Sequence, residues 1–497
     1  SGAAINIEPA AGSAILLDGT ISIDAGVVTG ATSITSTAFV GALTGNVAGN
    51  LTGTVATAAQ NSITTATGLV TVGAGNTTTT VAGIPFHAPI GDNSIYTHDV
   101  SGTDDSATGN TAFGINAMDA ITTGDINTAI GYQALGANTT GTQNVAIGRN
   151  SLILNTTSTA NTGIGTSALS AVTTSGGNTA VGGDALKTNT AAENTALGYQ
   201  AGQSNTSGVR IIAIGKGAYT ASDTENDNIA IGHQAMTTNT AGGTGNIALG
   251  NYALDALTSG DSNVAVGHHA LGANTTGGNN TGIGYQAMLS NTTGGNNTSI
   301  GRNALDNNTT ASDNTAVGNL ALHDTTTGDK NVAIGSLALE NNTTGSDSVA
   351  MGYGALGTNT TGGLNVAVGK NALTTNNADA NVAVGFEALK DNTTGAGNTA
   401  VGKFALTNNT TAASNTAIGK DAMFTNTTGA ENVSIGNDSL IYNTTGSNNI
   451  AIGVECMDAN TTGAANVGIG KATLGANTTA DHNTALGAYA MKDNTTG

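Results

Sequence analysis

The chain has few side chains that could take part in catalysis or bind a metal. Cys456 is the only cysteine, which excludes an intrachain disulfide. Of the seven histidines only His268 and His269 are adjacent. If they lie in a strand, their side chains point to opposite faces, which disfavours chelation of one ion. We find no Ser-His-Asp arrangement, carboxylate pair or Walker loop, and we expect no enzyme activity, no metal site and no cofactor.

Two short motifs resemble functional patterns. Gly163-Ile-Gly165 and Gly468-Ile-Gly470 are similar to part of a dinucleotide-binding loop. Asn-Thr-Thr triplets, such as the one at Asn138, match the N-glycosylation acceptor pattern. Both motifs recur at fixed positions of a longer repeat. We therefore interpret the glycines as packing positions and the asparagines as part of a turn or a ladder.

The repeat covers most of the chain. From Asn110 onward a motif that starts with Asn, as in Asn127-Thr-Ala-Ile-Gly131, recurs 23 times with a period of 17 residues. The period slips by one residue only before Asn194, Asn246 and Asn381. A fixed period predicts a solenoid, and this one is too short for helical hairpins. We predict an all-β, elongated β-solenoid or β-roll of about 23 turns, with two short strands per turn and a length of roughly 110 Å.

We number the repeat from its first Asn as position one. Position five is glycine in all 23 turns, which predicts a positive φ angle or a close backbone approach. Position three is always Ala, Gly or Ser, whereas positions four and nine, such as Ile130 and Leu135, are large, apolar and the predicted core. Position two, which is Thr, Val or Ile, is predicted to line a partly buried surface. Cys456 stands at position eight, where nearly every turn has Ala, so we interpret it as a buried spacer.

Positions six and seven vary most. Position six holds seven of the 12 Lys and Arg residues of the chain. If the coil recognises a receptor, this row is the predicted surface, and a merely solvated face is the alternative interpretation. The candidate recognition residues are Tyr132, Arg149, Tyr199, His233, Tyr285, Arg302, Tyr353 and Lys370.

The chain before the repeat is organised differently. Residues 1–83 contain glycine tetrads with a period of four, from Gly41-Ala-Leu-Thr to Gly53-Thr-Val-Ala, and an Asp18-Gly19 turn between strand-like runs. We predict a β-rich stalk there. Residues 84–109 include Pro85 and Pro89 and are the least repetitive part. We interpret them as a junction that leads into a β-roll over residues 110–497.

Composition agrees with a fibrous protein. The chain has 73 glycines, three prolines and no tryptophan, and only 9% of its residues are charged, which suits no large globular core. A net charge of −20 disfavours nucleic-acid binding. No apolar run is long enough for a transmembrane helix, so no membrane insertion is expected. The chain starts at Ser1 and stops at Gly497 within a repeat, from which we expect a processed product or part of a longer protein.

Two parts of the sequence resemble known families. Asn144-Val-Ala-Ile-Gly148 and Asn432-Val-Ser-Ile-Gly436 resemble the head repeat of YadA-like trimeric autotransporter adhesins, which form left-handed β-rolls as homotrimers. The tetrads and the stretch around Asp18 are similar to segments of environmental phage tail-fibre-like proteins. The period is longer than the usual head repeat, and a neck and coiled-coil stalk are absent, which favours the phage-type fibre. The resemblance implies an extracellular homotrimer, a virion tail fibre or cell-surface appendage, that binds a cell-surface glycan or protein.

Three alternatives stay open. The chain could be a matrix or surface filament component, which would polymerise end to end, or a bacterial trimeric autotransporter-like adhesin. An ice-binding solenoid is the outsider. Threonine ladders suit ice binding, but adjacent residues such as Thr139 and Thr140 alternate in direction and do not form a flat array.

Overall fold

The computed structural model describes Ala11 and residues 79–81, 84–86, 95–96 and 106–495. The chain divides into two units, residues 1–69 and 70–497, and the described residues other than Ala11 belong to the second. The predicted Asp18-Gly19 turn and the glycine tetrads lie outside the described residues. The same is true of most of the predicted junction.

The described part of the chain contains strands and turns but no helix. The strands are β1 (Thr79–Val81), β2 (Ile84–Phe86), β3 (Ile95–Tyr96), β4 (Thr111–Phe113), β5 (Thr128–Ile130), β6 (Val145–Ile147), β7 (Thr162–Ile164), β8 (Thr179–Val181), β9 (Thr195–Leu197), β10 (Ile212–Ile214), β11 (Ile229–Ile231), β12 (Ile247–Leu249), β13 (Val264–Val266), β14 (Thr281–Ile283), β15 (Thr298–Ile300), β16 (Thr315–Val317), β17 (Val332–Ile334), β18 (Val349–Met351), β19 (Val366–Val368), β20 (Val382–Val384), β21 (Thr399–Val401), β22 (Thr416–Ile418), β23 (Val433–Ile435), β24 (Ile450–Ile452), β25 (Val467–Ile469) and β26 (Thr484–Leu486).

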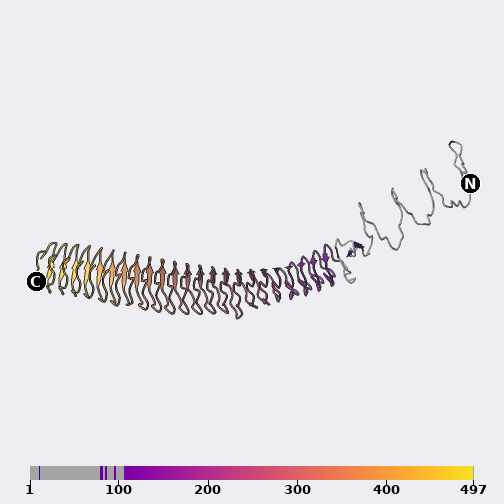
Figure 1. The fold of residues 1–497 in the computed structure, drawn as a ribbon, viewed down its shortest axis with the longest axis horizontal. Helices are drawn as coiled ribbons and strands as arrows, with labels where there is room; N and C mark the ends of the chain where they lie inside the picture. The colour runs from indigo at the N-terminus through magenta and orange to yellow at the C-terminus, as the bar shows by residue number, and fades with distance from the viewer. Residues whose placement is uncertain (1–10, 12–78, 82–83, 87–94, 97–105, 496–497) are drawn as a thin grey trace, which may run out of the picture. The chain divides into compact units, whose positions relative to one another are not determined.

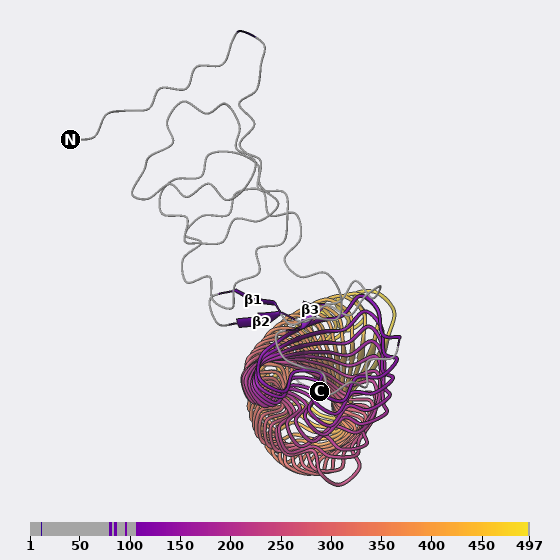
Figure 2. The same ribbon diagram turned by 90° about the vertical axis from the view of Figure 1, so that its right-hand side faces the viewer.

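Strands β4 to β26 occupy positions two to four of the 23 repeats, and each pairs in parallel with the next. The register is constant, so that Ala129 lies beside Ala146 and Ile130 beside Ile147. It is kept where the period slips, as between β8 and β9, because the slip is absorbed outside the strand. The arrows in Figure 1 therefore stack side by side along the coil, and Figure 2 shows its turns lying behind one another. The predicted parallel β-solenoid of about 23 turns is confirmed.

Each turn contains one strand, so the prediction of two strands per turn is wrong. The rest of the turn bends through residues with left-handed φ angles at positions seven, nine and seventeen. In the second turn these are Gln133 (56°), Leu135 (50°) and Gln143 (59°). Such a conformation costs roughly 1–2 kcal/mol for a residue with a side chain. Hydrogen bonds between turns, including Leu135 N–H to Ser151 O at 3.1 Å, and burial of the leucine offset that cost.

The core differs from the prediction at one position. Leu135 is buried as predicted, but Ile130 is 38% exposed, so its predicted place in the core is wrong. Side chains alternate along a strand, and the small residue at position three, such as Ala129, points inward. The interior is narrow: a Cβ on Gly163, at this position, would lie 2.6 Å from Ser151 Oγ. Only small side chains fit there, and the larger ones at positions two and four face outward.

Two ladders of buried asparagines run through the coil. At position one, Asn127 Oδ1 accepts hydrogen bonds from Asn144 N–H (2.9 Å) and Asn144 Nδ2 (3.1 Å). At position twelve, Asn155 Nδ2 donates to Asn138 Oδ1 at 3.0 Å. These bonds satisfy amides that would be costly to bury unpaired. The Asn-Thr-Thr triplets are thus ladder elements, as predicted.

The invariant glycine at position five has the predicted conformation. Gly131 has a φ angle of 132°, and a Cβ there would lie 2.7 Å from Gly148 O in the next turn. Any side chain would therefore meet both strain and a backbone clash. The second glycine of Gly163-Ile-Gly165 is the same position five, with a φ angle of 133°. Packing accounts for both glycines of that motif.

A candidate recognition row along the coil

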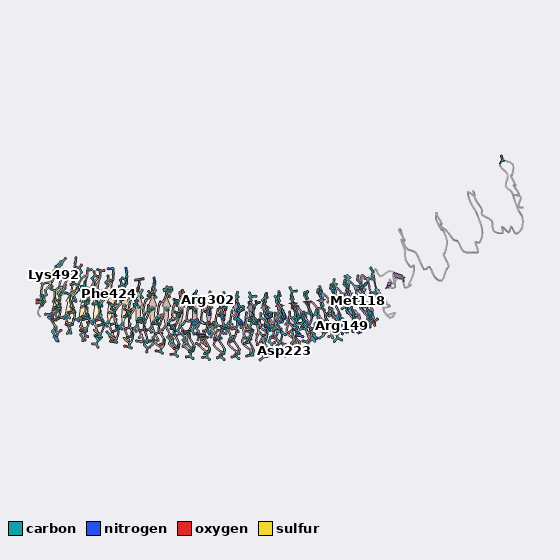
Figure 3. All side chains as sticks on the ribbon, in the orientation of Figure 1. Met118, Arg149, Asp223, Arg302, Phe424 and Lys492 are labelled. Atoms are coloured by element: carbon teal, nitrogen blue, oxygen red, sulfur yellow. The ribbon has the colours of Figure 1, made fainter. Side chains whose placement is uncertain are left out.

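Positions six and seven follow the turning glycine and form what we call the recognition row. The tyrosines predicted there, Tyr132, Tyr199, Tyr285 and Tyr353, are 44% to 52% exposed. Arg149, Arg302 and Lys370 are also exposed, and His233 is half-buried. Figure 3 shows Arg149 and Arg302 well separated along the coil.

The backbone of the row is held as firmly as the strands. Gln133 N–H donates to Ile115 O, Asn150 N–H to Tyr132 O and Ser167 N–H to Arg149 O, each at 2.9 Å. Each bond joins position seven of one turn to position six of the preceding turn. The side chains of the row consequently repeat at the strand spacing, about 4.8 Å.

One stretch of the row is a cluster of five aromatic rings. His233 contacts Tyr252 edge-on with ring centroids 5.3 Å apart, and Tyr252 stacks on His269 at 4.8 Å. His268 stacks on Tyr285 at 5.6 Å. The rings of His268 and His269 lie 4.3 Å apart because both residues follow Gly267 in a turn rather than in a strand. The prediction that their side chains point to opposite faces is therefore wrong.

The histidine cluster has no third metal ligand close enough to complete a site. Among the described residues no group of three or more His, Cys, Asp or Glu side chains could hold a metal ion. Burial raises the pKa of the neighbouring Asp255, and His269 partly opposes that shift. An open groove of about 500 Å³ adjoins the cluster; it is lined by Gln200, Lys216, Gly217, Thr220, Ala221, His233, Gln234 and Thr237.

A second stretch of the row combines rings and lysines. Lys370 Nζ lies 5.9 Å from the ring centroid of Tyr353 and 6.0 Å from that of Phe386. Lys403 Nζ lies 4.7 Å from the centroid of Phe404. The rings of Phe386 and Phe404 touch edge-on at 5.3 Å.

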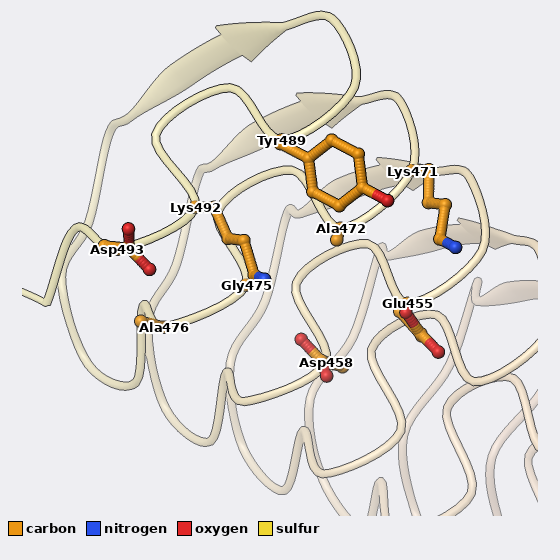
Figure 4. A pocket seen from close by; sticks show the side chains of 9 residues that line it. All are labelled: Glu455, Asp458, Lys471, Ala472, Gly475, Ala476, Tyr489, Lys492 and Asp493. Atoms are coloured by element: carbon orange, nitrogen blue, oxygen red, sulfur yellow. The ribbon is translucent and has the colours of Figure 1, made fainter.

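A third cluster lies in the last described turns. Figure 4 shows Tyr489, Lys471 and Lys492 around the same hollow as the carboxylates of Glu455 and Asp458. Burial raises the pKa of Asp458, with Glu455 adding to the shift and Lys492 opposing it. Lys492 Nζ lies 5.4 Å from the centroid of the Tyr489 ring.

Position six of the row carries charges opposite in sign to the net charge of the whole chain. Position six carries seven Lys or Arg residues and no Asp or Glu in 23 turns, whereas the chain has a net charge of −20. Within the described residues only Lys420 of these seven forms an ion pair, with Asp421. The remaining six are Arg149, Lys216, Arg302, Lys370, Lys403 and Lys471, all of them exposed. Position six can therefore attract anions, whereas position seven of the same row carries the carboxylates of Asp184, Glu387, Asp421, Asp438 and Glu455.

The structure brings only some of the predicted residues into contact. His233 and Tyr285 join the same ring cluster, and Tyr353 contacts Lys370. The ring partners that were not among the candidate recognition residues include Tyr252, His269, Phe404 and Phe424. Tyr252, His269 and Phe404 stand at position seven of turns next to an aromatic residue at position six, so a search for rings at both positions in adjacent turns would have found these three.

Cys456 has no feature of a nucleophile. Its side chain is buried, and its thiol donates to Gly468 O at 3.2 Å. Burial raises the pKa of the thiol to about 11, which disfavours the reactive thiolate. The interpretation of Cys456 as a buried spacer is confirmed.

Comparison of the chain with models of known protein families found no matching family, and comparison with curated proteins found no matching relative. In the described part of the chain, no helix is long and apolar enough to cross a membrane.

Proposed function

We propose that this chain is the subunit of an extracellular, non-enzymatic fibre, a homotrimer that contacts a host cell surface as phage tail fibres do. The observation that carries the proposal is the apolar outer face of the strand ladder. We define this outer stripe as the side chains at positions two and four of β4 to β26. The outer stripe supports self-association of the chain. The recognition row beside it supports the adhesive role.

The outer stripe leaves many large apolar side chains without cover. Ile334 is 38% exposed, Ile418 39% and Met351 41%. Their neighbours at position two share the same face and are Val or Ile in twelve turns, such as the half-buried Val332, and Thr in the other eleven. Exposed apolar surface of this continuity marks an interaction site rather than ordinary protein surface.

The size of the stripe fits a partner as long as the coil itself. The stripe is about 110 Å long and about 7 Å wide, so its projected area is on the order of 700 Å². The uneven surface of the side chains adds to this area. Monomers rarely expose an apolar patch above roughly 600 Å², and a standard interface covers about 800 Å² per partner. A second copy has the same strand spacing and the same stripe, so it can match this face along its whole length.

Closed symmetry favours a discrete assembly over an open one. Homo-oligomers in solution usually have cyclic symmetry, in which every copy covers the same surface. Three coils that turn their outer stripes toward a common axis would cover all three, in agreement with the homotrimers implied by the resemblance to adhesin head repeats. The recognition row begins after the strand has ended, so this arrangement leaves it at the rim.

Two measurements test the proposal. Light scattering of the purified chain should give three times the chain mass of 48.2 kDa, independent of concentration over a wide range. The isolated protein should also compete with the intact fibre for attachment to its host cells. A mass of one chain contradicts the assembly, and a trimer that never competes for attachment contradicts the adhesive role.

The alternatives predict other results from the same sample. A matrix or surface filament would grow end to end, with a mass that rises with concentration and no length limit in micrographs. An autotransporter-like adhesin would also be trimeric but would require anchoring to a bacterial outer membrane. Ice binding is disfavoured because threonine hydroxyls such as that of Thr139 donate to a carbonyl of the next turn, Thr156 O, at 3.1 Å. Thermal hysteresis in a dilute solution of the protein would support ice binding.

A further inference from the structure

We propose that the row from Tyr353 to Lys420 binds an anionic polysaccharide in which acidic and neutral sugars alternate. The proposal rests on the proposed adhesive function and names the chemistry of its partner. It is carried by the order of side chains at position six and by their contacts.

Five successive turns present rings and amines in one line. Position six holds Tyr353, Lys370, Phe386, Lys403 and Lys420 in that order. All five side chains are exposed. Nowhere else in the row do aromatic and cationic residues alternate over four turns.

The rings are fixed by their neighbours. Phe404 contacts Phe386 at 5.3 Å and Phe424 at 6.0 Å, both edge-on, which joins three rings into one platform. Lys403 Nζ lies within 6 Å of two of these rings, those of Phe386 and Phe404. A platform held in this way loses little side-chain freedom when a ligand binds.

The ammonium groups remain available to a ligand. Among the described residues the ion pairs include neither Lys370 nor Lys403, whose ammonium groups lie near aromatic rings. The two carboxylates at position seven of this stretch, Glu387 and Asp421, pair with Lys390 and Lys420. An exposed cation–π contact is weak, so a carboxylate can add to it without breaking a strong bond. Lys420 differs because Asp421 already pairs with it. We assign anion binding to Lys370 and Lys403 and ring stacking to Tyr353 and Phe386.

The spacing of the side chains at position six indicates which kind of polymer can bind. Residues of one kind recur every second turn, about 10 Å apart, because the turns are spaced by about 4.8 Å. A disaccharide unit of a linear glycan extends over a similar distance, with one pyranose face above a ring and one carboxylate beside a lysine. In an extended acidic peptide, by contrast, side chains on one face recur about every 7 Å, out of step with the row. A nucleic acid is disfavoured as the ligand because its closely spaced phosphates would be repelled by a chain of net charge −20.

Binding of defined polymers to the full chain tests this assignment. The probes are oligosaccharides of hyaluronan and of chondroitin, which alternate uronate and neutral amino sugar, with dextran, polymannuronate and polyglutamate as comparisons. We expect at least one alternating probe to bind by titration calorimetry, polymannuronate to bind more weakly, and dextran and polyglutamate not to bind. The double variant Lys370→Gln, Lys403→Gln should weaken binding by roughly a hundredfold and Phe386→Ala by about tenfold.

The matched control is Lys216→Gln together with Lys471→Gln, two exposed lysines at position six outside this stretch. It should leave the affinity within about twofold of the parent. Absence of binding by both alternating probes, equal binding of polyglutamate, or equal loss in the control would overturn the assignment. Mass measured on the same samples separates the two proposals: trimers that bind no probe contradict this inference alone, and monomers that bind contradict the assembly alone.

Discussion

Asn127 Oδ1 accepts hydrogen bonds from both nitrogens of Asn144, the backbone N–H at 2.9 Å and the side-chain Nδ2 at 3.1 Å. The two residues occupy the same position, position one, in adjacent turns. Asn144 Oδ1 in turn accepts a hydrogen bond from Asn161 N–H at 3.0 Å, one turn further on. One amide thus connects three successive turns, and the stability of the coil depends on interactions between turns rather than within them.

Removal of one amide from this ladder should destabilise the coil. In Asn432→Ala, Asn449 N–H loses its acceptor, Asn432 Oδ1 at 2.9 Å, whereas Gly446 O loses one donor but keeps Asn443 Nδ2 at 2.9 Å. One buried N–H left unpaired should cost about 1–3 kcal/mol in unfolding free energy. Denaturant unfolding followed by circular dichroism measures the loss.

Asn432→Ser is the matched comparison for that variant. Ser348 occupies the same position naturally and accepts from Asn365 N–H at 3.2 Å. The serine variant should therefore lose less stability than the alanine variant. Equal losses would show that the side-chain acceptor of the ladder contributes nothing.

Position five should tolerate no side chain. In Gly284→Ala the added Cβ would lie 2.3 Å from Gly301 O, at a φ angle of 144°. Strain and clash together should cost about 3 kcal/mol or more. Gly136→Ala is the control, because its Cβ would meet no atom closer than 3.3 Å and its φ angle is not left-handed. Hydrogen exchange would place the loss in the turns around Gly284, and similar exchange in both variants would contradict this prediction.

The sequence was sufficient to predict the stacking of turns because the period appears directly in the residues. It also identified Gly131 and Leu135, whose types are fixed by packing within and between turns. The direction of Ile130 could not be inferred in the same way. A large apolar residue is equally compatible with a core and with an interface, and only the narrowness of the coil decides between them.

The conformation of the turn could not be predicted from the sequence pattern either. Leucine is unusual at a left-handed φ angle, so Leu135 suggested a strand rather than a bend. The same bend brings His268 and His269 together and creates the aromatic contacts of the recognition row. Residues such as Tyr132 were predicted to be exposed because their position varies, and they are.

Cys456 should be unreactive in the folded chain and replaceable by serine. Its thiol donates to Gly468 O, and Ser151 at the same position donates to the equivalent Gly163 O at 2.8 Å. Cys456→Ser should change the unfolding free energy by less than about 1 kcal/mol near neutral pH. A thiol reagent should modify the parent only after denaturant is added. Rapid labelling of the native protein would contradict the burial of this side chain.

The thiol also predicts a dependence of stability on pH. Burial raises its pKa from 9.0 to about 11, so the unfolded chain releases this proton first as the pH rises. The contribution of the thiol is complete below pH 9.0 and is lost between pH 9.0 and about 11. The parent should therefore lose about 2 kcal/mol relative to Cys456→Ser across this range. Parallel pH profiles of the two proteins would contradict the shift.

A charge on the outer stripe should disrupt assembly without unfolding the coil. Ile334→Lys replaces a side chain that is 38% exposed in the single coil. At an interface between copies, the unpaired charge should cost several kcal/mol per chain. Leu364→Lys is the control, because Leu364 is 62% exposed at position seventeen, outside the stripe, where Lys330 stands naturally in another turn. Circular dichroism should be unchanged in both variants, and only Ile334→Lys should reduce the mass in solution.

The mass of the parent chain in solution is the most direct test of its proposed self-association. Light scattering coupled to size exclusion should give a particle of three chains of 48.2 kDa each, because the apolar outer stripe requires cover along its whole length. A stable particle of one chain, with Ile334 and its neighbours exposed to water, would contradict the proposal that the coil assembles with copies of itself into a fibre.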